Sequence, residues 1–192
     1  LSRREILKRA AAAGMTSAVP AKALAQVLPE RARDQFENLS NTESEILEAV
    51  VSRLIPTDEN GPGALEAGAA NYIDKGLANA LSQSHAAYSV GLAALDSYAD
   101  QVTGRGFVSL EPGEQDSLLE DLEQNRAVGF GSDSATFFNL MLRHTIEGTF
   151  SDPAYGGNQD FIGWEMIGYP GIRLGVTVEQ QQMDYFPEMT RV

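Results

Sequence analysis

The sequence predicts an all-α protein, a single irregular helical bundle followed by a long irregular C-terminal segment rich in aromatic residues and glycine. Three observations support this class. Apolar residues recur at helical intervals in several runs, and most of these runs begin or end at a capping residue, a proline or a glycine. No run of useful length alternates apolar and polar residues, as a half-buried strand would. The chain is 43% apolar but only 8% aromatic, which fits a helical domain.

The first helix of the body has the clearest start signal. Ser40 stands three residues before Glu43, which is the spacing of a capping box, and Leu39 precedes it as a candidate hydrophobic staple. Six apolar residues then follow at helical spacing: Ile46, Leu47, Val50, Val51, Leu54 and Ile55. Pro56 stops the pattern, so we expect a helix with one buried face that ends just before this proline.

Four further helices are expected, each from its own apolar stripe. The second runs from about residue 64 to 81 and the third from about 84 to 102. Pro112, at the first helical position, opens the fourth, and the fifth spans about residues 134 to 147. The apolar residues that define these helices are Ala69, Ile73, Leu77 and Leu81, then Tyr88, Leu92, Leu95 and Tyr98, then Leu118, Leu119 and Leu122, and last Phe137, Phe138, Met141, Leu142 and Ile146.

Helical periodicity ends at Gly148. The residues that follow are rich in turn formers, and only residues 164–168 are compatible with a helical turn. Because aromatic residues and glycines in such a segment cannot bury one another by periodicity, they must pack on the bundle or on another chain.

The N-terminal residues have the order of a twin-arginine export signal. Ser2, Arg3, Arg4, Leu7 and Lys8 carry the motif, a weakly apolar stretch follows over residues 10–19, and residues 23–25 resemble a signal-peptidase site. The alternative is an amphipathic N-terminal helix with adjacent arginines. We therefore divide the chain into a signal segment (1–25), a linker (26–38), a helical domain (39–171) and a C-terminal arm (172–192), and expect a periplasmic protein.

The twin-arginine route carries folded proteins, and it is typically used for proteins that bind a cofactor before export. The body of this chain offers no such site: no glycine-rich phosphate motif follows a strand, and no serine lies in a nucleophile elbow. The absence of cysteine excludes disulfides, iron–sulfur ligation, covalent haem and a cysteine nucleophile in this chain. We therefore expect the exported cofactor to belong to a partner.

The charge of the body narrows the class of partner. From residue 26 onward the chain has 26 acidic and nine basic residues, a formal charge of −17. Such a surface repels nucleic-acid phosphates and anionic lipid headgroups, so both are disfavoured as ligands. A basic partner remains compatible with this charge.

The two histidines leave one alternative chemistry. His144 and Glu147 are three residues apart on the fifth predicted helix, so they could face one metal ion, although di-iron bundles need a second such pair. One alternative function is therefore a stand-alone metal-dependent enzyme that uses His144 and Glu147. The other interpretation of His144 is a purely structural role. A periplasmic protein that binds a small molecule between helices is another alternative function.

The aromatic segment and the arm are the predicted partner interface. Tryptophan and tyrosine are enriched at protein interfaces, and glycine allows close backbone approach. The predicted interface residues are Tyr155, Asn158, Trp164, Tyr169, Tyr185 and Phe186. The other interpretation is that Trp164, Tyr155 and Tyr169 are core residues covering the end of the bundle.

Two blocks of the chain resemble the gluconate 2-dehydrogenase subunit 3 family. The first lies within residues 40–74 and contains residues 53–59, 61–68 and 72–74; the second contains residues 144–148, 150–158, 163–164 and 167–171. The resemblance covers about residues 39 to 171, and the second block is the more specific one.

The resemblance implies a small subunit without catalytic residues of its own, in a bacterial periplasmic sugar or polyol dehydrogenase complex. In such complexes the large subunit is a glucose-methanol-choline-type flavoprotein that carries FAD, and a cytochrome c often takes the electrons onward. Haem c or an iron–sulfur cluster elsewhere in the complex is compatible with this picture, as is membrane association through partners. The small subunit would bind and stabilise the flavoprotein and export it through the twin-arginine translocase. No cofactor is expected in this chain, and the resemblance does not indicate which sugar is oxidised.

Overall fold

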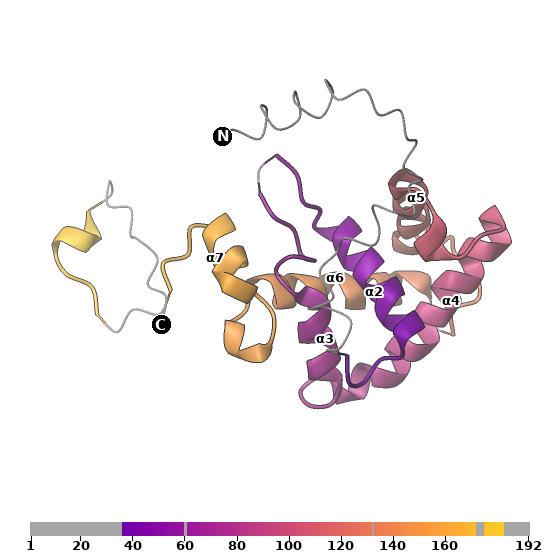
Figure 1. The fold of residues 1–192 in the computed structure, drawn as a ribbon, viewed down its shortest axis with the longest axis horizontal. Helices are drawn as coiled ribbons and strands as arrows, with labels where there is room; N and C mark the ends of the chain where they lie inside the picture. Colours follow the sequence, from indigo (N-terminus) through magenta and orange to yellow (C-terminus); the bar gives the residue numbers. More distant parts are fainter. Residues whose placement is uncertain (1–35, 60, 132, 172–174, 183–192) are drawn as a thin grey trace, which may run out of the picture. The chain divides into compact units, whose positions relative to one another are not determined.

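A computed structural model describes residues 36–59, 61–131, 133–171 and 175–182, and its architecture is all-α, as predicted (Figure 1). The α-helices are α2 (Asn41–Leu54), α3 (Ala69–Leu77), α4 (His85–Thr103), α5 (Pro112–Glu123), α6 (Ser134–Phe150) and α7 (Ile162–Met166). Short 3-10 helices lie at Ser82–Ser84, Phe107–Ser109, Pro153–Tyr155, Gln159–Phe161 and Glu179–Gln181. Within the described ranges there is no β-strand, and no helix has the length and apolarity needed to cross a bilayer.

The predicted helix starts are confirmed where a capping motif was present. At α2 the Glu43 amide donates to Ser40 Oγ at 3.4 Å, while the Ser40 amide donates to Glu43 Oε2 at 2.9 Å, which completes the capping box. Helix α5 begins at Pro112 as expected, and α6 begins after Asp133, whose carboxylate accepts from the Thr136 amide at 2.7 Å. These starts are local, because each depends on residues within one turn.

The second predicted helix begins five residues later than expected. The Ala64 amide donates to the Ile55 carbonyl at 2.9 Å, which ties the chain back to the end of α2 instead of starting a helix. A Cβ on Gly63 would overlap that same carbonyl oxygen, and Gly68 has φ +74°. A glycine-dependent turn therefore separates α2 from α3, which begins at Ala69.

Helix α6 is the centre of the bundle and packs against α2, α3, α4, α5 and α7. It extends to Phe150, three residues beyond the predicted end. The core around it is formed by side chains from every helix of the bundle, and the largest of those buried completely are Ile46, Leu47, Ile73, Tyr88, Leu92, Leu95, Phe107, Leu122 and Met141. The apolar stripes predicted for α2, α4 and α5 all face this core.

A buried carboxylate fixes the chain just before α2. Asp74, fully buried on α3, accepts hydrogen bonds from the amides of Glu37, Asn38 and Leu39 at 2.8, 3.0 and 2.9 Å. The Asn38 side chain donates in turn to the Asp74 carbonyl at 2.9 Å. Three backbone donors satisfy the buried carboxylate, and these hydrogen bonds hold the residues just before α2 against α3.

Candidate partner interface

Two stretches of sequence about 75 residues apart pack together at one end of the bundle. The Gln159 amide donates to the Ala67 carbonyl at 2.9 Å, and the Tyr72 hydroxyl donates at 3.2 Å to Glu147 Oε2, 75 positions further along the chain. The backbones come close because Gly148 has no side chain: a Cβ there would lie 2.9 Å from Ala69 Cα. The turn before α3 and the segment after α6 therefore form one structural unit.

Asn158 holds the segment after α6 against the end of that helix. It is fully buried, its amide donates to the Gly148 carbonyl at 2.8 Å, and its side-chain amide donates to the Ser151 carbonyl at 2.8 Å. Its Oδ1 accepts from the Gly163 amide at 2.8 Å. Asn158 adopts φ +43°, a left-handed conformation that asparagine tolerates better than most residues. One side chain thus joins the end of α6 to the start of α7.

Two glycines allow this close packing. A Cβ on Gly157 would overlap the carbonyl oxygen of Gly148, and a Cβ on Gly163 would overlap that of Thr149. Neither position can accept a larger residue unless the backbone moves. The glycines of the segment therefore have a packing role within this chain.

Trp164 is part of this packing. Its side chain is 8% exposed, and its indole Nε1 donates to the Phe150 carbonyl at 2.8 Å. The ring of Tyr169 meets it edge-on with centroids 4.8 Å apart, and the ring of Phe161 lies 5.5 Å away. Trp164 is thus the anchor that seats α7 on α6.

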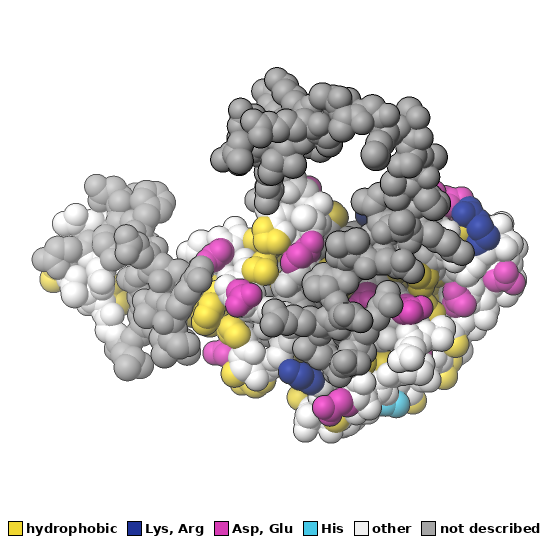
Figure 2. Space-filling model, in the orientation of Figure 1, with side chains coloured by type: hydrophobic (Ala, Val, Ile, Leu, Met, Phe, Trp, Pro, Cys, Tyr) yellow, Lys and Arg dark blue, Asp and Glu magenta, His cyan; other side chains and the backbone are white. Residues whose placement is uncertain are grey.

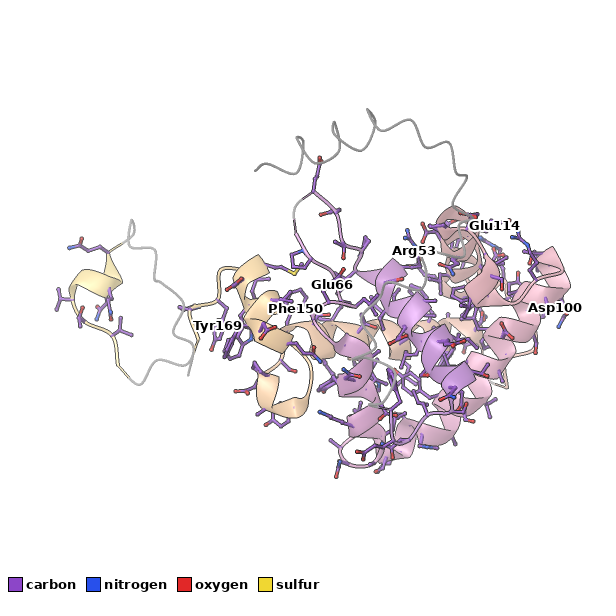
Figure 3. All side chains as sticks on the ribbon, viewed as in Figure 1. Arg53, Glu66, Asp100, Glu114, Phe150 and Tyr169 are labelled. Atoms are coloured by element: carbon purple, nitrogen blue, oxygen red, sulfur yellow. The ribbon has the colours of Figure 1, made fainter. Side chains whose placement is uncertain are left out.

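The surface around α7 is apolar and open to solvent. Ile167 is 59% exposed, and Met166 and Tyr169 are each 40% exposed; we call these three residues the α7 patch. Figure 2 shows hydrophobic side chains gathered near α7 among acidic ones, and Figure 3 places Tyr169 beside this helix. Several large apolar side chains exposed together are typical of a surface that binds another protein.

The predicted interface residues divide into two groups. Tyr155, at 67% exposure, and Tyr169 are on the surface, whereas Asn158 and Trp164 are buried and can affect a partner only by shaping the segment. Tyr185 and Phe186 lie outside the described residues, as do the export residues Ser2, Arg3, Arg4, Leu7 and Lys8, so these assignments remain predictions.

Sequence reasoning did not single out Met166 and Ile167. The sequence signal for their exposure is weak, because a helix as short as α7 has too few residues for its apolar pattern to show which side faces solvent. The orientation is set by the buried Gly163 and Trp164 on the opposite side.

His144, the candidate metal ligand, is occupied by neighbours within the chain. Its Nε2 lies 3.2 Å from Arg143 Nη2, and because a guanidinium can only donate, Nε2 accepts. The ring proton then lies on Nδ1, which donates to the Tyr88 hydroxyl at 3.0 Å. Burial lowers the pKa of His144, which favours the neutral ring.

The surroundings of His144 do not suit a cation. A metal would need Nε2, which faces the guanidinium of Arg143. Glu147 accepts instead from Tyr72, and among the described residues no three histidine, cysteine or acidic side chains are grouped as a metal site would require. The geometry supports a structural His144.

Two grooves lie on the bundle surface. One, of about 470 Å³, lies between α2, α5 and α6; the other, of about 740 Å³, lies between α4, α6 and the loop at Phe130. Both are open to solvent, whereas small-molecule sites usually enclose most of their ligand. Open grooves of this kind suit a segment of another chain better than a small molecule.

Comparison with known protein families identifies a match. The family model described as gluconate 2-dehydrogenase subunit 3 matches residues 41–171, from the first turn of α2 through the segment after α7. No curated protein and no solved structure matches the chain. The matched range includes both the bundle and the α7 patch.

Proposed function

Because the chain belongs to the gluconate 2-dehydrogenase subunit 3 family, we propose that it is the non-catalytic small subunit of a dehydrogenase complex. Its role is to bind and stabilise a large subunit of the glucose-methanol-choline type that carries FAD. The substrate is then a sugar or polyol, chosen by the large subunit. A cytochrome c subunit would receive the electrons.

The observation that carries this proposal is the α7 patch. Ile167, Met166 and Tyr169 are exposed, yet they stand on a segment that the buried Asn158 and Trp164 hold rigidly against α6. Rigid apolar anchors lose little conformational entropy on binding, so they favour a stable protein interface. The polar groups that could serve catalysis, His144 and Glu147, hydrogen-bond within the chain instead.

The sequence pattern at the N-terminus supports a role in export. Arg3 and Arg4 stand before a weakly apolar stretch, so we propose that this chain carries its folded partner through the twin-arginine translocase to the periplasm. The flavin belongs to the partner in this scheme, which explains a signal for folded cargo on a chain whose body has no cofactor motif.

Co-purification of the large subunit tests the binding role. Ile167→Asp places a charge in the α7 patch and should raise the dissociation constant of the complex about tenfold or more, because a desolvated carboxylate in an apolar contact is costly. Val102→Asp is the matched control, since Val102 is 55% exposed on α4 and lies outside the patch. Equal binding by both variants would refute the assignment of the interface to α7.

Localisation tests the export role separately. Replacing Arg3 and Arg4 by lysine keeps the charge but removes the twin-arginine motif, so both subunits should accumulate in the cytoplasm. Arg9→Lys is the control. A flavoprotein that still reaches the periplasm with the double variant would disprove co-export.

A further inference from the structure

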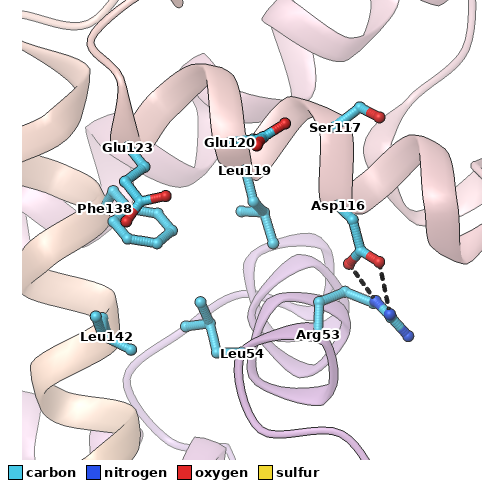
Figure 4. A pocket seen from close by; sticks show the side chains of 9 residues that line it. All are labelled: Arg53, Leu54, Asp116, Ser117, Leu119, Glu120, Glu123, Phe138 and Leu142. Carbon is cyan, nitrogen blue, oxygen red and sulfur yellow. Dashed lines mark hydrogen bonds and ion pairs between the residues drawn. The ribbon is translucent and has the colours of Figure 1, made fainter.

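The groove between α2, α5 and α6 has an apolar floor. Leu54 from α2, Leu119 from α5, and Phe138 and Leu142 from α6 line it, as Figure 4 shows. The groove has a volume of about 470 Å³ and is open to solvent. It lies apart from the α7 patch and plays no part in the hydrogen bonds that hold α7.

The rim of this groove is acidic. Glu120 and Glu123 are exposed on α5, and neither forms an ion pair with a described residue. Arg53 also lies on the rim, but its Nε and Nη2 donate to the two oxygens of Asp116 at 2.7 and 2.8 Å. That pair is internally neutral, so the rim has a net negative charge from Glu120 and Glu123.

The apolar floor continues along α6. Phe138, Leu142, Ile146 and Phe150 follow one another at four-residue intervals, so they form one ridge that winds around the helix by about 40° at each step. Ile146 is 45% exposed, and Phe150 supplies the carbonyl that accepts from Trp164. A twelve-residue rise corresponds to about 18 Å, so an apolar strip runs from the acidic rim toward α7.

We propose that this strip binds an amphipathic, cationic helix of the large subunit, an inference that rests on the proposed function. A ridge of this kind, inclined about 26° to the axis of α6 and rising about 18 Å along it, can pack into the groove of a partner helix that crosses α6 at an angle. Lysine or arginine at one end of that helix would pair with Glu120 and Glu123. The partly exposed floor residues Leu54 and Leu142 would contact its apolar face.

Charge argues against the other occupants. A second copy of this chain would bring another body with a formal charge of −17, and anionic lipid or nucleic acid would be repelled by the same field. A cationic protein segment gains both apolar burial and charge complementarity.

A designed peptide tests the groove without the natural partner. A helical peptide of leucine and lysine should bind the full chain, and a leucine–glutamate peptide of the same length should not. The double variant Glu120→Lys/Glu123→Lys should raise the dissociation constant of the cationic peptide about tenfold, from two lost attractions and two new repulsions. Circular dichroism checks that each variant is folded.

A matched control separates the groove from general attraction to an acidic protein. Glu45→Lys/Asp100→Lys changes the net charge equally, and both residues are exposed and outside the groove lining. An equal loss of peptide affinity in both double variants would overturn the proposal. A third variant, Ile146→Ser, should weaken binding without a change of charge, because Ile146 forms part of the strip.

The natural complex provides the second measurement. The large subunit, separated from the purified complex, should bind Glu120→Lys/Glu123→Lys about tenfold more weakly than the control pair, with a shallower dependence on salt. If a flavoprotein binds the wild-type chain, and binds Glu120→Lys/Glu123→Lys as tightly as the control pair, the groove assignment is wrong and the subunit role stands. If no flavoprotein binds the wild type, the subunit role fails, and the peptide measurement still decides the chemistry of the groove. If the wild-type chain forms a dimer and Glu120→Lys/Glu123→Lys is monomeric, the groove binds a second copy of the chain and the proposal is overturned.

Discussion

Replacing Gly163 by alanine should loosen α7 from α6 and disturb the α7 patch. The added Cβ would overlap the Thr149 carbonyl oxygen and lie 3.1 Å from Asn158 Oδ1, so the backbone must move. Movement weakens the hydrogen bond from the Gly163 amide to Asn158 Oδ1, now 2.8 Å long. Overpacking costs about 1–3 kcal/mol and one hydrogen bond about 1 kcal/mol, while the helix preference of alanine returns up to about 1 kcal/mol. A net loss of about 2 kcal/mol in the free energy of unfolding follows from these three contributions.

The single tryptophan of the chain makes this loss measurable at the site itself. Trp164 is 8% exposed, so its emission should shift to longer wavelength when α7 detaches, and in urea this transition should occur at lower concentration than in the wild type. Gly113→Ala is the matched control, because Gly113 lies in the first turn of α5 and a Cβ there would have nothing within 4 Å, so the change should be neutral or slightly stabilising. A Gly163→Ala protein with wild-type stability and emission would refute the packing argument.

Two further substitutions test the buried polar groups. Asp74→Asn replaces one of the two oxygens that accept from the Glu37, Asn38 and Leu39 amides by an NH2 donor, so it should lower the free energy of unfolding in urea by about 1–3 kcal/mol. The control Asp100→Asn, at an exposed residue, should change it by less than about 0.5 kcal/mol. His144 should make the stability of the protein depend on pH, because burial lowers the pKa of its ring in the folded state below the ordinary value of 6.5. The unfolded state then binds more protons than the folded state, so the free energy of unfolding falls as the pH drops below about 6.5. Carboxylates titrate in the same pH range, so the free energy of unfolding of the wild type is compared with that of His144→Gln at about pH 7.5 and at about pH 5.5. If the difference between the two proteins is the same at both pH values, the pKa of His144 is not lowered.

Local sequence signals predicted the helices well where they were complete. Ser40 with Glu43, and Pro112, satisfy backbone groups within their own first turn, so the start of α2 and of α5 could be predicted without knowing the fold. The start of α3 could not. Ala64 pairs with the Ile55 carbonyl, and Gln159, far along the chain, pairs with the Ala67 carbonyl, so contacts outside any local window stop the helical pattern there.

The candidate interface shows the same division. The composition of residues 148–171 indicated a segment that must pack on the bundle or on a partner, and the structure contains both a packed and an exposed aromatic residue: Trp164 packs inside and Tyr155 faces solvent. Both are large aromatic residues in irregular sequence, and neither lies in a repeating pattern that would separate them.

The sequence by itself determined the all-α class, the capped helix starts, the membership suggested by two motif blocks, and the acidic character of the body. Each of these depends on composition, on neighbours within a turn, or on a linear motif. The tertiary structure decided which aromatic side chains are exposed, that His144 is held between Tyr88 and Arg143, and that an acidic groove adjoins α6. The physical reason is that burial and hydrogen-bond partners here come from residues far away in the sequence, such as the Tyr72–Glu147 pair, 75 positions apart. Local patterns do not report such contacts.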